Sequence, residues 1–498
     1  MKTWLLFPDR DLPIDAHPLW NADGLINDIE LGPLISAMAA NDQFLAEIAT
    51  RVILEPLVSV DEIRYRQDVL NDCRNQESIV RELFALAGEA LMRERKVYGW
   101  MSDRNPATTL QHAIEVLEIF VALLRTLRTI ASEHREDFHS AGFTRFFRMV
   151  LDELDDAYFA EIDAHLRRLR LRRGVLMSAQ LDHTGKVSGV VLRRPLRDKQ
   201  TLVERLHALT HPSLSFRIAD RDEAGGEALT QMRGRGITLV ADALARSTDH
   251  IHGFFTRMRD ELGFYLGALN AWHLLEGRGH LVVFPDPQPR QIHEFTADGL
   301  YDVSLACVSD GPVTGNDIRA AGHPLIIVTG ANRGGKSTFL RSVGLAQIMM
   351  QAGLFVGANA LSLSVSTGLF THFKREEDQS MTSGKFDEEL VRMRDVVNHL
   401  VPGALMLFNE SFAATNEREG SEIGRQVIHA LLDRDIRVVF VTHQYDLARS
   451  FVDDGSAYFL RAERERTFKL VEGDPLPTSF GVDLYQRIFG HAPLGSGA

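Results

Sequence analysis

The residues with the clearest chemical meaning form a glycine-rich segment between an apolar run, residues 325–328, and a helical run, residues 339–343. The segment fits the pattern G-x-x-x-x-G-K-[ST], and its members are Gly330, Ala331, Asn332, Arg333, Gly334, Gly335, Lys336, Ser337 and Thr338. Glycines let backbone N–H groups approach phosphate oxygens, while the lysine reaches the outer phosphates and the serine hydroxyl binds Mg²⁺. The pattern therefore predicts a strand, a phosphate loop and a helix that bind a nucleoside triphosphate.

A second apolar run ends in Asn409 and Glu410. In phosphate-loop ATPases this position usually carries two acids, one for the Mg²⁺ shell and one that polarises the attacking water. We therefore predict Glu410 as the catalytic base, and Ser337, Asn409 and Glu410 as the metal-binding residues. Because residue 409 is an amide without the negative charge that helps to hold the ion, we expect weaker metal binding and slow turnover.

Two further segments complete the predicted site. The apolar run 437–441 leads to His443, which we expect to sense the γ-phosphate and to act with Glu410 and Lys336 in catalysis. Ser383 and Gly384 precede a helical pattern, and the N-terminus of a helix attracts anions. In ATPases of the ABC class such a pair binds the γ-phosphate of the nucleotide held by the opposite subunit, so we add both residues to the nucleotide-binding set.

The elements that must position these residues fall into two regions, and the predicted fold class is multidomain, α followed by α/β. Residues 33–276 have apolar residues at helical spacing and predict a helical core, with a capping box from Ser59 to Glu62 and a β-hairpin at 174–194. Residues 277–490 predict an ATPase domain with a mostly parallel sheet, including short strands at 281–284 and 303–305. Residues 1–32 are assigned only as an N-terminal arm.

The predicted helices of the first region have long amphipathic patterns. They cover residues 79–98, 110–130, 143–170 and 227–275. This succession predicts a bundle with long arms.

The composition limits the classes of protein to consider. The chain has 498 residues, of which 45% are hydrophobic and 25% charged, as in a globular protein of about two to four domains. Its two cysteines, Cys73 and Cys307, exclude a disulfide framework and favour a reducing, cytoplasmic location. We expect neither a signal peptide nor a membrane span. The net charge of −13 argues against indiscriminate binding to nucleic acid, although a local basic surface remains compatible with it.

Two basic runs flank the predicted hairpin. Their members are Arg167, Arg168, Arg170, Arg172 and Arg173 before it, and Arg193, Arg194, Arg197 and Lys199 after it. One interpretation is a surface that contacts the phosphate backbone of a nucleic acid. The other is a solvated helix end that pairs with the acidic residues in 152–156. The sequence favours neither.

With these motifs in place, the chain resembles the MutS family, the ATPases of DNA mismatch repair. The likeness is strongest from about residue 260 to 485, where residues 329–338 match the family pattern T-G-x-N-x-G-G-K-S-T. It continues through the Ser383, Asn409 and His443 segments, through a loop between subunits at 415–420, and through the tail at 468–470 and 478–481. A weaker similarity to the start of the family's helical core covers residues 54–57 and 64–68.

The resemblance implies a homodimer in which two chains enclose two ATP molecules with Mg²⁺, so that Lys336 and Ser337 of one chain face Ser383 and Gly384 of the other. It also implies DNA as a partner. Mismatch-reading members of the family carry an N-terminal domain with a Phe-x-Glu wedge. Because no such domain fits before residue 33, we expect a reduced member with the helical core and the ATPase but without the mismatch reader.

Three functional hypotheses follow. The first is a dimeric, ATP-gated clamp or sensor in DNA repair or recombination. The second is a nucleotide-dependent scaffold with little hydrolysis that acts through protein partners, and it is motivated by Asn409. The third, an ATPase of the chromosome-cohesion or transporter type, ranks last because the sequence shows neither long heptad arms nor a membrane partner.

Overall fold

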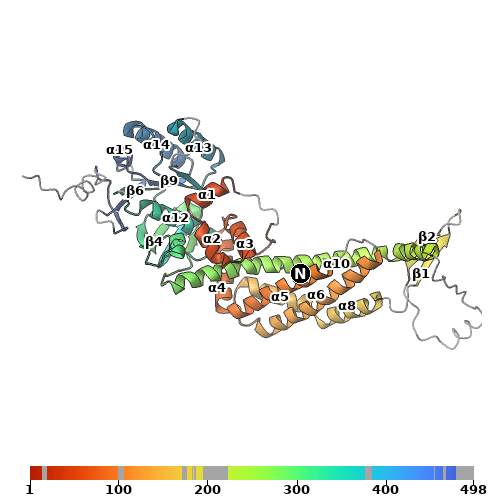
Figure 1. The fold of residues 1–498 in the computed structure, drawn as a ribbon. Helices are drawn as coiled ribbons and strands as arrows, with labels where there is room; N and C mark the ends of the chain where they lie inside the picture. The colour runs from red at the N-terminus through yellow and green to blue at the C-terminus, as the bar shows by residue number, and fades with distance from the viewer. Residues whose placement is uncertain are drawn as a thin grey trace, which may run out of the picture. The chain divides into compact units, whose positions relative to one another are not determined.

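The computed structural model of the chain describes residues 1–13, 19–98, 106–170, 176–181, 183, 187–193, 223–331, 333–375, 384–453, 455–463 and 467–477 (Figure 1). The chain divides into two compact units. The first unit comprises Met1–Thr3, Arg81–Asp137 and Thr144–Arg259, and the second comprises Trp4–Val80, Phe138–Phe143 and Asp260–Ala498. Each unit is described below by itself. None of the helices among the described residues is long and apolar enough to cross a membrane.

The first unit is helical. Its helices include α5 (Glu77–Tyr98), α6 (Pro106–His134), α7 (Ala141–Glu153), α8 (Asp156–Leu169) and part of α10 (Glu223–Gly277). Buried aromatic side chains join them, since Phe120 of α6 lies against Phe255 of α10, and Phe146 of α7 lies against Phe254. The helices predicted from periodicity are therefore confirmed, except that the stretch 143–170 forms two helices, because Asp155 caps the start of α8 and accepts the Tyr158 N–H.

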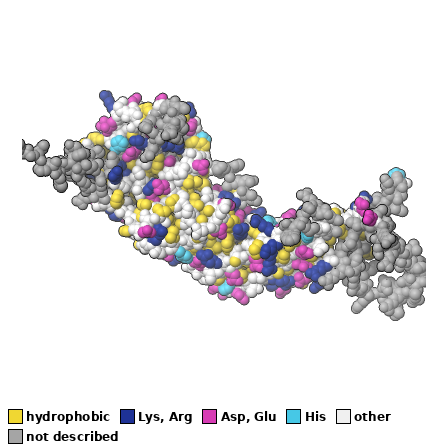
Figure 2. Space-filling view, in the orientation of Figure 1, with side chains coloured by type: hydrophobic (Ala, Val, Ile, Leu, Met, Phe, Trp, Pro, Cys, Tyr) yellow, Lys and Arg dark blue, Asp and Glu magenta, His cyan; other side chains and the backbone are white. Residues whose placement is uncertain are grey.

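The predicted hairpin is also present, as strands β1 (Met177–Leu181) and β2 (Val187–Leu192) in antiparallel pairing. Of the basic runs beside it, Arg172, Arg173, Arg194, Arg197 and Lys199 lie outside the described residues. Arg170 donates two hydrogen bonds to Glu118 at 2.9 and 2.8 Å, whereas Asp156 in the acidic run pairs with Arg128 at 2.5 Å. Neither of these contacts joins the two runs. Cationic and anionic side chains both occur across the face shown in Figure 2.

The second unit contains a six-stranded sheet in the order β12-β11-β6-β10-β9-β8. The strands are β6 (Leu325–Gly330), β8 (Leu369–Phe373), β9 (Leu405–Asn409), β10 (Arg437–Val441), β11 (Ala457–Ala462) and β12 (Leu470–Glu472). All neighbours pair in parallel except β11 and β12. The mostly parallel sheet predicted for this region is therefore confirmed.

A smaller four-stranded sheet has the order β3-β7-β4-β5. Its strands are β3 (Asp286–Gln288), β4 (Phe295–Leu300), β5 (Asn316–Arg319) and β7 (Ala360–Ser364), and between β3 and β4 lies the short 3₁₀ helix η1 (Arg290–Ile292). The pairing is mixed, because β3 is parallel to β7 whereas β4 is antiparallel to both β5 and β7.

Two strand predictions in this region are wrong. Residues 303–305 begin a helix, α11 (Val303–Val308), because the Asp302 side chain accepts a hydrogen bond from the Leu305 N–H and caps the first turn. Residues 281–284 contribute only an isolated bridge between Val283 and Val356. Both segments are too short for their apolar pattern to separate a strand from a helix.

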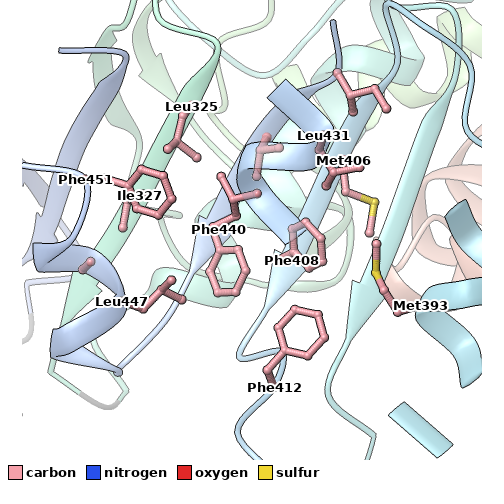
Figure 3. Packing of buried hydrophobic residues seen from close by; sticks show 14 of the residues in the cluster. Leu325, Ile327, Met393, Met406, Phe408, Phe412, Leu431, Phe440, Leu447 and Phe451 are labelled. Atoms are coloured by element: carbon pink, nitrogen blue, oxygen red, sulfur yellow. The ribbon is translucent and has the colours of Figure 1, made fainter. Parts of the chain in front are cut away.

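Both faces of the large sheet are covered, which explains the nearly continuous apolar sequence of its central strands. Helices α13 (Lys385–His399), α14 (Glu417–Leu432) and α15 (Tyr445–Arg449) cover one face, and α12 (Lys336–Gln351) covers the other (Figure 1). On the first face Phe408 packs against Phe440, with ring centroids 4.8 Å apart, and against Phe412 (Figure 3). On the second face Leu407 lies close to Gly344 of α12.

The N-terminal residues that the sequence left as an arm are packed into the second unit. Leu5, Leu6 and Phe7 are fully or almost fully buried. The Glu261 carboxylate accepts hydrogen bonds from the N–H groups of Leu5 and Leu6, at 2.6 and 3.3 Å. Four short or medium helices follow along the chain: α1 (Ala22–Asp28), α2 (Gly32–Ala39), α3 (Gln43–Ile53) and α4 (Val60–Asn75).

Helix α4 begins as predicted, because the Ser59 hydroxyl accepts a hydrogen bond from the Glu62 N–H. Its Arg66 is fully buried and donates to the carbonyl groups of Leu6 and Ala352, at 2.8 and 3.3 Å. Ala352 is the C-cap residue of α12. Arg66 therefore joins the N-terminal segment, α4 and the end of the helix that follows the phosphate loop.

The stability of this unit should depend on pH through Glu261. Burial raises the pKa of Glu261 to about 8, against the opposing effect of the Leu5 and Leu6 N–H groups. The folded chain therefore holds this proton more tightly than the unfolded chain, and the stabilisation is lost as the pH rises through about 8. We expect the melting temperature of the Glu261→Gln variant to fall less between pH 6 and pH 9 than that of the wild type. Equal slopes in a thermal unfolding series, or the same change for the exposed Glu276→Gln control, would contradict this assignment.

Candidate nucleotide site

The phosphate-loop segment connects the end of β6 to the start of α12. Gly330 and Gly335 have φ angles of 109° and 89°, in the left-handed region that favours glycine. A Cβ atom at Gly334 would lie 2.7 Å from the Ala462 Cβ and 2.9 Å from the Ala331 carbonyl oxygen. Conformation and close packing therefore both require glycines at these positions, and the loop is held against β11.

Lys336 begins α12 and its side chain turns back into the loop. Its Nζ donates hydrogen bonds to the carbonyl oxygens of Gly330 and Ala331, both at 3.0 Å. Burial lowers the pKa of Lys336, while the negative charge of Glu410 opposes this shift. The ammonium group is thus placed among the loop residues. Of the other predicted members of the loop, Asn332 lies outside the described residues.

The other predicted residues come from the ends of neighbouring strands. Because β6, β10 and β9 are parallel neighbours, their carboxyl ends meet at one edge of the sheet. There the Ser337 hydroxyl donates a hydrogen bond to Asn409 Oδ1 at 3.1 Å. His443 Nδ1 lies 3.9 Å from Glu410 Oε1. The structure therefore brings together Lys336, Ser337 and the ends of β9 and β10.

Glu410 has an unusual backbone for a residue with a side chain. Its φ angle is 53°, and its N–H donates to the Val441 carbonyl at 2.9 Å. A non-glycine residue in the left-handed region costs roughly 1–2 kcal/mol, so surrounding contacts must hold it there. The Glu410 and His443 side chains remain partly exposed.

Gly384 lies elsewhere on the unit. It is the N-cap residue of α13, and its carbonyl accepts the Glu388 N–H. Helix α13 packs on β8, which is separated from β6 by β10 and β9, so that about 14 Å of sheet lie between the two strands. Ser383 lies outside the described residues. The phosphate loop and Gly384 are thus on separate parts of the same sheet.

Comparisons with known proteins add an independent result. The model of the MutS2 N-terminal domain matches residues 58–278, and the model of MutS domain V matches residues 326–466. The chain belongs to the MutS family. The second match contains the phosphate loop and the strands that carry Asn409 and His443.

Individual relatives agree with this assignment. The chain is 32% identical over 180 residues to an endonuclease MutS2 from Geobacillus thermodenitrificans, which is 35% of this chain and 23% of the relative. It is 32% identical over 154 residues to a DNA mismatch repair protein MutS from Methanosarcina mazei, 30% of this chain and 17% of the relative. It is 26% identical over 240 residues to MutS protein homolog 4 from Mus musculus, 47% of this chain and 24% of the relative. The matches thus span about a quarter or less of these MutS-family relatives.

A cavity beside the phosphate loop was not predicted. It has a volume of about 200 Å³ and shares Gly335 and Thr338 with the loop and the first turn of α12. Phe339 and Phe468 contribute apolar walls, and Asn316 contributes an amide whose Oδ1 accepts the Leu470 N–H at 2.7 Å. Phe468 belongs to the tail segment that resembles the MutS family, but the sequence did not indicate which residues would meet it.

A methyl group in the loop should disturb this site. We expect Gly334→Ala to lower the free energy of unfolding by about 1–3 kcal/mol, because the new Cβ must displace β11 or the loop carbonyl. We also expect a marked loss of nucleotide affinity. Gly277→Ala is the matched control, since nothing lies within 4 Å of a Cβ there. Chemical unfolding and titration with a fluorescent nucleotide measure the two effects, and unchanged values for Gly334→Ala would rule out the steric argument.

Proposed function

We propose that the chain is an ATP-binding and ATP-hydrolysing protein of the MutS family that acts on DNA in repair or recombination. The observation that carries this proposal is the meeting of Lys336, Ser337, Glu410 and His443 at the carboxyl edge of one parallel sheet. Family membership and the names of the relatives support the DNA part, because one is named for DNA mismatch repair.

In the proposed mechanism the phosphates lie in the loop between β6 and α12. The positive end of α12 points at them, and Lys336 exchanges its two carbonyl contacts for phosphate oxygens. The cavity beside Gly335 and Thr338 receives the nucleoside. The residues of the loop thus bind and orient the substrate before any chemistry.

Glu410 accepts the proton of the attacking water, and His443, 3.9 Å away, helps to hold that water in place. Ser337 and Asn409 fit a metal ion by chemistry, since they present two oxygen atoms 3.1 Å apart at the sheet edge and Mg²⁺ prefers oxygen ligands. When bound, Mg²⁺ would neutralise negative charge on the phosphates.

The proposed assembly is a homodimer with each nucleotide between two chains. The separation of α13 from the phosphate loop across the sheet supports this arrangement, because Gly384 caps a helix that packs on β8, whereas Lys336 follows β6. Ser383 and Gly384 would then contact the nucleotide held by the second copy. Closure around ATP would couple nucleotide state to the dimer contact.

The test is steady-state ATP hydrolysis by the purified chain, alone and with single-stranded, fully paired, mismatched and branched DNA. We expect a rate that rises with at least one of these DNA structures. Lys336→Ala should weaken ATP binding about 10- to 100-fold, because it removes a charge-assisted contact to phosphate. If the variant keeps wild-type affinity, the nucleotide site is wrongly placed; if DNA changes neither rate nor affinity, the DNA part fails.

The Ser337–Asn409 contact favours a second candidate function, a nucleotide-dependent scaffold with little hydrolysis. Asn409 contributes no negative charge to a metal ion, and its oxygen is already engaged by Ser337. In this alternative ATP holds two copies of the chain together, and a protein partner binds the resulting dimer.

Asn409→Asp distinguishes the two candidates. A carboxylate at this position should raise Mg²⁺ affinity and turnover by about tenfold, because it adds one negative charge beside the metal position. A slow wild type that is accelerated by this change supports the scaffold, and a brisk wild type supports the ATPase. Asn359→Asp, at an exposed position just before β7, is the control for an added negative charge. Mg²⁺-dependent turnover and nucleotide affinity are measured for all three proteins.

A further inference from the structure

The segment after β9 contains two non-glycine residues in the left-handed backbone region. Glu410 has a φ angle of 53° and Phe412 has one of 63°. Ser411, between them, is 1% exposed, and Phe412 is fully buried. Because each such residue is strained, the position of the Glu410 side chain depends on the contacts that hold Ser411 and Phe412.

Those contacts come from α13 and β8. Glu389 of α13 accepts the Phe412 N–H with its carboxylate at 2.6 Å. His372 of β8 contacts both the segment after β9 and α13, with Nδ1 2.7 Å from the Ser411 Oγ and Nε2 3.2 Å from the Glu389 carbonyl oxygen. The Ser411 hydroxyl is also 2.6 Å from the His372 carbonyl oxygen. Both His372 and Glu389 are more than nine-tenths buried.

Counting protons shows that these contacts are linked. Burial is the main cause that lowers the pKa of His372 to about 4, and Arg392 and Arg375 add to it, so the ring is neutral at neutral pH and has one N–H. If Nε2 carries the proton, it donates to the Glu389 carbonyl, and Nδ1 accepts the Ser411 hydroxyl. If Nδ1 carries it, it donates to Ser411, whose hydroxyl turns to the His372 carbonyl, and the bond to α13 is lost.

We propose that His372 and Ser411 are positioning residues. Together with Glu389 they connect α13 to the segment after β9, so that the position of α13 determines where the Glu410 side chain lies. The inference rests on the proposed function, because Gly384, the N-cap residue of α13, is assigned there to the nucleotide of the second chain. A shift of α13 when ATP is engaged would change the His372 and Glu389 contacts together. The catalytic base is thereby adjusted only when the nucleotide is held from both sides.

Two substitutions separate the two links of His372. Asparagine places an amide near the position of Nδ1 and so keeps a partner for Ser411, whereas glutamine reaches the position of Nε2 and keeps a partner for Glu389. We expect both His372→Asn and His372→Gln to lower kcat about tenfold or more, because small displacements of a catalytic group cost at least this much. The KM for ATP should stay within about twofold, because the loop that binds the phosphates is unchanged.

Non-additivity is the sharper result. If the residues form one relay, the double variant His372→Asn with Ser411→Ala should have no lower kcat than the worse single variant. His399→Gln on the exposed part of α13 is the matched control, with melting temperatures measured for every variant. Losses in kcat that simply multiply, or that follow the melting temperatures, would mean that the cluster is only structural.

A second measurement does not need turnover. Hydrogen exchange followed by mass spectrometry reports the amides of residues 408–414 and of α13 with and without ATP. In the wild type we expect ATP to change both segments together, and in Ser411→Ala to change α13 alone. If the wild type fails to bind ATP, the proposed function fails. The other outcome separates the two proposals. If the wild type binds ATP and Lys336→Ala does not, the nucleotide site stands. If ATP then still changes the exchange of both residues 408–414 and α13 in Ser411→Ala, only the role of His372 and Ser411 is overturned.

Discussion

The parallel pairing of β6, β10 and β9 is the constraint on which the candidate site depends. Parallel strands in register bring their carboxyl ends to one edge, and each of these strands leads into residues that we assign to the nucleotide site. The predicted phosphate loop begins at the end of β6, Asn409 ends β9 and Glu410 follows it, and His443 follows β10. Their apolar side chains are packed on both faces, so a shift of one residue would exchange the side chains that fill the two faces and disturb their close packing. The core therefore positions the chemistry.

The charged groups at this edge of the sheet include Lys336 and Glu410. Lys336 is buried among carbonyl groups, with Glu410 as the charge that opposes the lowering of its pKa. The neighbour of Glu410 is the neutral Asn409, whose oxygen accepts the Ser337 hydroxyl. A site with one anion fewer holds a divalent cation less tightly, and this single replacement separates the two functions proposed for the chain.

Buried polar groups connect the site to the rest of its unit. Arg66 joins the N-terminal segment and α4 to the C-cap of α12, and the adjacent Gly353, with a φ angle of 74°, leaves room for its side chain. At the other side of the sheet His372 and Glu389 join α13 to the segment after Glu410. The C-terminal end of α12 and the segment after β9 are thus held by different neighbours.

The sequence by itself determined the phosphate loop, the strands around it, the Ser59 cap and the hairpin, because each depends on residues close together in the chain. The glycines at 330 and 335 are needed for local backbone geometry, and the apolar runs are needed to fill both faces of the sheet. The sequence-based prediction was wrong at residues 303–305, where the Asp302 cap favours a helix over the predicted strand. It also missed the packing of residues 4–7, which includes contacts with Glu261 and Arg66. Only the tertiary structure decided those contacts, the cavity beside Thr338 and the His372–Ser411 pair. These features join residues that are far apart in the sequence, and a local sequence pattern does not indicate which distant donor and acceptor will form a hydrogen bond.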